Sequence, residues 1–259
     1  LQKKNVDVRV VIPRHRVIKN ETMYGVELLG EFDVYLQWRK QRAKVLVKPG
    51  EVPVYFIEND YYFSRGALYG FDDDNERFAF FGKAVLDMLA MLDFYPDVIH
   101  CNDWQTGLIP VYLKERFSQG EFYQGIKSII TIHNLKFQGI WDIKKVKDIT
   151  GLPDSYFTPD KLEAYNDANY LKGGIVYADR VTTVSATYAE EIKTPFYGEH
   201  LDGLMNARAN CLSGIVNGID YDVYNPETDK SLVANYNQVT FRKEKWKNKV
   251  ALQKELGLT

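Results

Sequence analysis

The sequence has few cysteines, no long apolar run and no surplus of charge of either sign, and each shortage excludes a class of protein. No segment approaches the roughly 18 consecutive apolar residues of a membrane-spanning helix. Lys and Arg total 33 and Asp and Glu total 35, so no basic excess favours a nucleic acid or an anionic membrane as a partner. Cys101 and Cys211 form no CxxC pair, which argues against a zinc site or a disulfide framework and favours a reducing, cytoplasmic location.

Several catalytic signatures are also missing. Neither GxGxxG nor GxxxxGK[ST] occurs, and Lys172-Gly173-Gly174 does not have the form of a phosphate loop. Ser185 has no GxSxG context, and the adjacent His100 and Cys101 would point to opposite faces of a strand. The sequence therefore gives no nucleotide fingerprint, no serine hydrolase triad and no Cys/His dyad.

What the chain does contain is the composition and periodicity of a globular α/β protein. Of its 259 residues, 45% are hydrophobic and 26% are charged, which excludes disordered and collagen-like chains. Strand-like runs alternate with helical patterns from residue 97 onward, and this alternation predicts parallel β-α-β units. The predicted strands are 97–102, 126–132, 181–184 and 212–216. The predicted helices are 72–92, 107–117, 170–178 and 188–192, the last with a capping-box start at Thr187, and residues 133–169 are expected to form a long loop.

The first part of the chain predicts a different kind of sheet. Residues 6–12 read as a strand stopped by Pro13, and four short β-like runs between residues 25 and 57 predict antiparallel hairpins added to the main sheet. Because the first strand follows so closely on Leu1, we expect a segment to have been removed upstream. A turn at residues 225–229 ends the α/β pattern, so we predict one domain over 1–238, incomplete at its start, and a linking helix over 239–259.

Candidate functional residues follow the predicted strands. Ligands of open parallel α/β sheets bind beyond the carboxyl ends of the strands, where the connecting loops converge. The polar segments at these ends are His100-Cys101-Asn102-Asp103-Trp104-Gln105, Thr131-Ile132-His133-Asn134-Leu135, Ser185 and Asn217-Gly218-Ile219-Asp220. We therefore expect the ligand at this edge of the sheet.

Each candidate also has a purely structural interpretation. Asp103 and Trp104 would suit a sugar, through carboxylate hydrogen bonds and ring stacking, or would be a helix cap and a core residue, and the residues support both equally. A strand-end histidine such as His133 is more often structural than catalytic. Asn217 precedes a glycine and reads first as a turn. The aromatic loop containing Tyr69 is explained more simply by packing than as the floor of a cleft.

The order of four motifs identifies a resemblance. The segments 100–107 (HCNDWQTG), 131–139 (TIHNLKFQG), 177–185 (YADRVTTVS) and 214–220 (GIVNGID), together with 74–78 (DNERF) and 225–229 (NPETD), resemble bacterial glycogen synthase and plant starch synthase. The match extends over essentially the whole chain from Val6. It implies the amino-terminal, Rossmann-like half of a GT-B glycosyltransferase, carrying an added β-hairpin region, that extends an α-1,4-glucan from a nucleotide sugar with retention and without a metal or other cofactor.

The resemblance also assigns roles to residues. His133 corresponds to the family's histidine beside the donor glucose, with Asn134 next to it. Asp103 and Trp104 match the Asp-Trp pair that lines the catalytic cleft, and Gln105 stands where other members carry histidine. Asn217 matches an active-site asparagine, and Tyr69 corresponds to a cleft tyrosine within one or two positions.

The resemblance leaves some alternatives open. The family's amino-terminal strand, its Lys-Thr-Gly-Gly loop and its nucleotide-binding carboxyl-terminal domain are absent, so we expect an acceptor-side fragment that is inactive alone. The expected partners are ADP-glucose, which the bacterial motifs favour over UDP-glucose, an α-1,4-glucan and the missing domain. The rivals are a non-catalytic glucan-binding module, a GT-B transferase for sucrose or a lipid-linked sugar, and an α/β solute-binding domain.

Overall fold

The computed structural model describes residues 1–117 and 121–258 and divides into two compact units, Leu1–Ile215 and Val216–Thr259. The predicted domains include residues 118–120 and Thr259, which lie outside the described part of the chain. Within that part, no helix is both long and apolar enough to cross a bilayer.

The first unit contains a parallel sheet with the strand order β11-β10-β6-β5. Its strands are β5 (Val98–Asn102), β6 (Lys127–Ile132), β10 (Arg180–Thr183) and β11 (Leu212–Gly214), all paired in parallel. The helices of this part are α3 (Leu108–Tyr112), which continues as a π-helical turn over Leu113–Phe117, α5 (Tyr170–Tyr177), α6 (Ala186–Glu191) and α7 (Asp202–Ala207). The predicted parallel β-α-β alternation is confirmed, whereas α7 was not expected.

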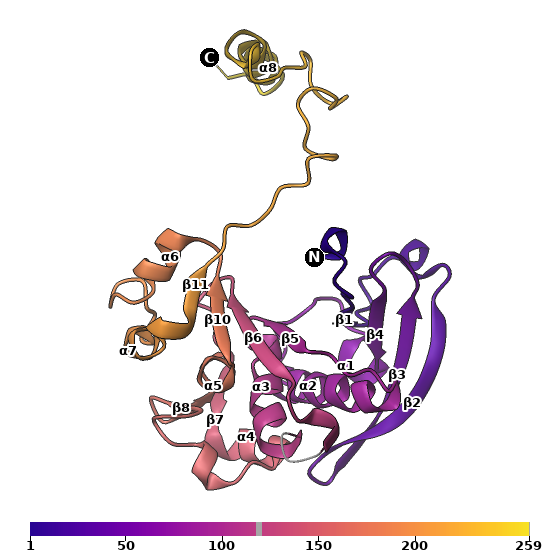
Figure 1. Cartoon of the computed structure of the whole chain (residues 1–259), viewed down its shortest axis with the longest axis vertical. Coiled ribbons are helices and arrows are strands. Elements are labelled where there is room, and N and C mark those ends of the chain that lie inside the picture. Colours follow the sequence, from indigo (N-terminus) through magenta and orange to yellow (C-terminus); the bar gives the residue numbers. More distant parts are fainter. Residues whose placement is uncertain (118–120, 259) are drawn as a thin grey trace. The chain divides into compact units, whose positions relative to one another are not determined.

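A second sheet has the order β1-β4-β3-β2. Its strands are β1 (Val10–Pro13), β2 (Glu27–Leu36), β3 (Arg39–Lys48) and β4 (Val54–Glu58), followed by α1 (Asp60–Phe63) and the long α2 (Asp74–Met91). In Figure 1 the strands β2 and β3 stand apart from β5, β6 and β10, and α2 lies between the two groups. The hairpins do not join the main sheet as expected, because β1 pairs in parallel with β4 and gives them a sheet of their own.

The segment predicted as a long loop is in fact folded. It contains β7 (Ile140–Asp142), α4 (Ile143–Thr150), β8 (Glu163–Ala164) and β9 (Asp167–Asn169), with the three strands in a small antiparallel sheet. Asp142 starts α4 by accepting a hydrogen bond from the Lys145 N–H at 3.0 Å. The strands are only two or three residues long, too short for a periodic pattern to predict them.

Side-chain caps and one close approach fix the helices beside the main sheet. The Ser185 Oγ accepts from the Tyr188 N–H at 2.9 Å, so α6 is capped by Ser185 and not by the predicted Thr187 box. The Asn169 Oδ1 caps α5 in the same way through the Lys172 N–H. A Cβ on Gly107 would lie 2.2 Å from the carbonyl oxygen of Tyr170. Glycine therefore lets the start of α3 touch the start of α5.

The second unit contains one helix, α8 (Phe241–Glu255), among its described residues, and none of its residues is buried. The sequence predicted a helix in this place. Its Trp246 and Leu252 side chains are more than half exposed, and those of Phe241 and Val250 are more than 40% exposed. The hydrophobic core belongs to the first unit, where α2 alone contributes Phe78, Phe80, Phe81 and Leu86.

Candidate active site

Two neighbouring strands bring Asp103 and His133 together. The strands β5 and β6 pair in parallel with Asn102 opposite Thr131, so both chains leave the sheet at the same edge. The Asp103 N–H donates to the Thr131 carbonyl at 3.0 Å, and the Asp103 Oδ1 accepts from the His133 N–H at 2.8 Å. The carboxylate therefore fixes the start of the loop that carries His133.

The structure contradicts the helix-cap interpretation of Asp103. Its side chain makes no cap bond to the 3-10 turn Trp104–Thr106 that follows. Its backbone has φ of 56° and ψ of −173°, a conformation that residues other than glycine seldom adopt. Asp103 thus acts as a brace between two loops and not as a helix cap.

The imidazole of His133 is oriented by a neighbour that was not among the expected site residues. Its Nε2 lies 3.0 Å from the Asn102 Oδ1. Because an amide oxygen only accepts, the imidazole donates this hydrogen bond through its Nε2–H. His133 itself is exposed at the strand end. It is therefore both oriented and accessible.

A row of polar side chains runs behind this pair. His100 Nε2 contacts the Thr131 Oγ1 at 2.5 Å, and that hydroxyl lies 2.7 Å from the Thr182 Oγ1. Partial burial, followed by the charge of nearby His133, lowers the pKa of His100. His100 is therefore neutral near pH 7 and serves as a hydrogen-bonding member of the sheet.

Trp104 lies beneath the site. It is 6% exposed and makes edge or tilted ring contacts with Phe78 at 5.0 Å, Trp141 at 5.4 Å and Tyr69 at 6.4 Å between ring centroids. A Cβ on Gly139, which has φ of +67°, would lie 2.6 Å from the indole. The ring is therefore packed on several sides, and Tyr69 is the exposed aromatic above it.

Tyr69 and Gln105 line a cavity of about 430 Å³ that also reaches Asn102 and His100. One wall is β1, another is β5, and the floor is an apolar face of α2 with Phe78, Phe81, Val85, Met88 and Leu89. Tyr69 is 51% exposed and Gln105 is half-buried. The cavity therefore adjoins the loop that carries Asp103.

Two candidates remain. Asn134 directly follows His133 and is exposed, and its Oδ1 accepts from the Lys136 N–H at 3.0 Å, which shapes the turn after His133. Asn217 lies in the second unit, whereas the other six candidates belong to the first.

The sequence reasoning missed the residues that hold the Tyr69 loop. Arg77 is fully buried and paired with buried Asp74. Both belong to the DNERF segment, and the signal was available because Asp and Arg three residues apart share a helix face. Among the described residues, no group of three or more His, Cys, Asp or Glu side chains could hold a metal ion.

These features define an α/β fold in which an exposed histidine, a carboxylate and amides lie at the carboxyl ends of neighbouring parallel strands. The chain belongs to the starch synthase catalytic domain family, whose model matches residues 1–207. It is 71% identical over 259 residues to a glycogen synthase of Lachnospira eligens and 56% identical over 260 residues to one of Lachnoclostridium phytofermentans.

Those alignments cover 99% and 100% of this chain but 54% of each relative, so the chain spans about half the length of the curated relatives it matches. A solved structure, the catalytic domain of starch synthase IV from Arabidopsis thaliana bound to ADP and acarbose, matches with a TM-score of 0.87 and 31% identity. The alignment covers 100% of this chain and 54% of the length of that structure.

Proposed function

We propose that this chain is the acceptor- and glucose-binding half of a glycogen synthase. The whole enzyme would transfer glucose from ADP-glucose to the non-reducing end of an α-1,4-glucan with retention. The observation that carries the proposal is the oriented, exposed His133, held by Asp103 and Asn102 at the edge where the resemblance requires a glucose-binding histidine. The identity to glycogen synthases over the whole chain and the ADP and acarbose bound by the starch synthase neighbour support the substrate class.

The geometry suits a transfer that depends on positioning. A retaining transfer through an oxocarbenium-like state needs the sugar to be held in place and the departing phosphate to be neutralised. In this proposal the imidazole of His133 hydrogen-bonds a sugar hydroxyl, and Asn134 supplies amide donors and acceptors beside it. In this proposal Asp103 and Asn102 position His133, Trp104 supports Tyr69, and Gln105 contributes a polar group at the cavity. For Asn217, the proposed substrate contact rests on the resemblance alone.

We propose two further parts of the whole enzyme. Residues 239–259 would link the domain over 1–238 to a nucleotide-binding domain that supplies cations for the phosphate, which is consistent with α8 burying none of its residues. The family's amino-terminal strand would lie between β1 and β5. Each of these strands pairs on one side only among the described strands. The added strand would fill the apolar part of the cavity between β1, β5 and α2, and the part beside Tyr69 and Gln105 would remain for the sugar. Both cysteines are free thiols, which supports the proposed cytoplasmic location.

The test is glucosyl transfer to a maltooligosaccharide primer by the full-length protein encoded by the gene. ADP-glucose and UDP-glucose are compared as donors, and His133→Ala is compared with the wild type. We expect elongation with ADP-glucose and a fall in kcat/KM of at least 100-fold in the variant, because positioning of the glucose is lost.

His200→Ala is the matched control, since His200 is an exposed histidine whose ring lies against Tyr165. It should keep wild-type kcat/KM. If the primer binds but neither donor elongates it, the chain is better explained as a glucan-binding module. If His133→Ala keeps its kcat/KM, the role of His133 is wrong.

A further inference from the structure

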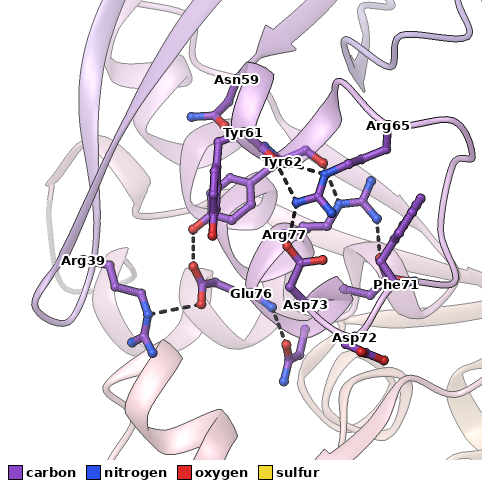
Figure 2. Close-up of polar contacts among 12 residues, drawn as sticks. Arg39, Asn59, Tyr61, Tyr62, Arg65, Phe71, Asp72, Asp73, Glu76 and Arg77 are labelled. Atoms are coloured by element: carbon purple, nitrogen blue, oxygen red, sulfur yellow. Dashed lines mark hydrogen bonds and ion pairs between the residues drawn. The ribbon is translucent and has the colours of Figure 1, made fainter.

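The loop over residues 64–73 is held from beneath by a buried ion pair. Arg77 and Asp74 lie in the first turn of α2, with side-chain exposures of 0% and 5%, and form an ion pair with each other. The Arg77 Nε donates to the Tyr62 carbonyl at 2.7 Å, before the loop begins (Figure 2). The guanidinium also lies 4.9 Å from the centroid of the Phe71 ring. The pair therefore contacts the loop and the segment that leads into it.

The two peptide groups that flank Tyr69 are both bound by this pair. An Arg77 Nη donates to the Leu68 carbonyl at 3.2 Å, on the amino-terminal side of Tyr69. The Asp74 Oδ2 accepts from the N–H groups of Gly70 at 2.5 Å and Phe71 at 3.1 Å, on the other side. A carboxylate and a planar guanidinium give directional, charge-assisted bonds. They therefore fix the backbone on both sides of Tyr69.

A second ion pair closes the loop at its ends. Arg65 contacts Asp73 at 2.8 Å and donates to the Tyr61 carbonyl at 2.9 Å (Figure 2). Gly70 has φ of +99°, a conformation that an L side chain strains, and a Cβ there would meet no atom within 4 Å. The loop path therefore depends on these few polar bonds and on one glycine.

The fixed backbone presents Tyr69 to the cavity. Its ring stands edge-on to Trp104 at an interplanar angle of 84°, and the side chain lines the cavity together with Gln105. A half-exposed aromatic ring held by a rigid loop suits the C–H face of a sugar ring. Pre-ordering of the loop also reduces the entropy lost on binding.

We propose that Asp74 and Arg77 are positioning residues for substrate binding, acting through the backbone of Leu68 and Gly70 to hold Tyr69 as a sugar platform. This inference rests on the proposed function. It adds a requirement that nothing in the strand-end cluster implies, namely that a buried ion pair in the first turn of α2 sets the affinity for sugar. Neither residue touches the substrate.

The test compares Asp74→Asn, Gly70→Ala and Tyr69→Ala in the full-length protein by steady-state kinetics with both sugar substrates. We expect each to raise the KM of at least one sugar substrate about tenfold while kcat stays within about threefold. The double variant Asp74→Asn/Tyr69→Ala should have the same KM as Tyr69→Ala alone, since both substitutions remove the same platform. Gly70→Ala disturbs the loop and leaves the ion pair in place. It therefore tests the proposal even if the Asp74 variant does not fold.

Asp179→Asn is the matched control. The Asp179 carboxylate likewise accepts from a backbone N–H, that of Ser128 at 2.8 Å, and contacts the Lys114 ammonium at 3.1 Å, but it lies at the far end of β6. It should lower stability and leave every KM unchanged. The inference is overturned if Asp74→Asn and Gly70→Ala keep wild-type KM values, or if the double variant shows additive losses.

A readout independent of catalysis separates this inference from the proposed function. Maltooligosaccharide affinity is measured by calorimetry, and amide exchange is followed at Gly70 and Phe71. If the wild type elongates no primer but Asp74→Asn weakens binding and speeds exchange, the function is wrong and the positioning role stands. If affinity and exchange are both unchanged in the variant, the positioning role is wrong whatever the enzyme does.

Discussion

The strand-end region around His133 and the loop around Tyr69 are held by different physical means. At the strand end, paired backbones of β5 and β6 set the geometry, and Asp103 adds one bond of 2.8 Å between them. At the loop, a buried ion pair provides the bonds. A sheet edge tolerates loss of a side chain because its hydrogen-bond ladder remains, whereas a loop held mainly by side-chain bonds from a buried ion pair does not. The two regions should therefore differ sharply in their response to mutation.

The largest effect should come from breaking the buried pair. Arg77→Met removes the guanidinium and leaves the Asp74 carboxylate buried without its cation, which costs about 3–5 kcal/mol of unfolding free energy. Urea denaturation monitored by fluorescence measures it. Arg42→Met is the control, because Arg42 and its partner Glu31 are exposed ion-pair members on β3 and β2. It should leave the midpoint essentially unchanged. Equal urea midpoints for the two variants would show that the buried ion pair stabilises the fold no more than the exposed one.

The strand-end region has its own sensitive point, which is steric. Gly107→Ala would place a Cβ 2.2 Å from the Tyr170 carbonyl oxygen and push α3 from α5, at a cost of about 1–3 kcal/mol. Gly203→Ala is the matched control in α7, where a Cβ meets no atom within 4 Å. It should be neutral or stabilising, since alanine favours a helix. A Gly107 variant as stable as the Gly203 variant would mean that the helices separate freely.

The same contrast explains how far the sequence could predict the molecule. Parallel strands and the helices between them follow from periodicity, so the main sheet and α5 were expected. Position at a strand end likewise predicted Asp103 and His133. Pairing between strands that are distant in sequence could not be predicted. No pattern indicates that β1 pairs with β4, or that residues 133–169 contain three very short strands. Asp74 and Arg77 were quoted only as part of a motif. Their spacing indicates a shared helix face, but no pattern indicates that their side chains bond the backbone of the preceding loop.

The smallest effect tests the surroundings of the ion pair through pH. Burial, followed by the positive charge of Arg77, lowers the pKa of His15 to about 4, and Asp74 opposes this shift. In the unfolded chain His15 binds a proton below its ordinary pKa of about 6.5, whereas in the folded protein it binds one only near pH 4. His15 therefore stabilises the fold fully above pH 6.5, and this contribution is lost as the pH falls toward 4.

Because the side chain is partly screened by solvent, we expect a loss of only about 1 kcal/mol between pH 7 and pH 4.5. The measurement is the urea midpoint of wild type and His15→Gln at both pH values. The carboxylates titrate equally in the two proteins, so the difference between them isolates His15. The wild type should lose more stability than the variant. Parallel losses would show that His15 takes up its proton at its ordinary pKa, and that Arg77 does not act on it.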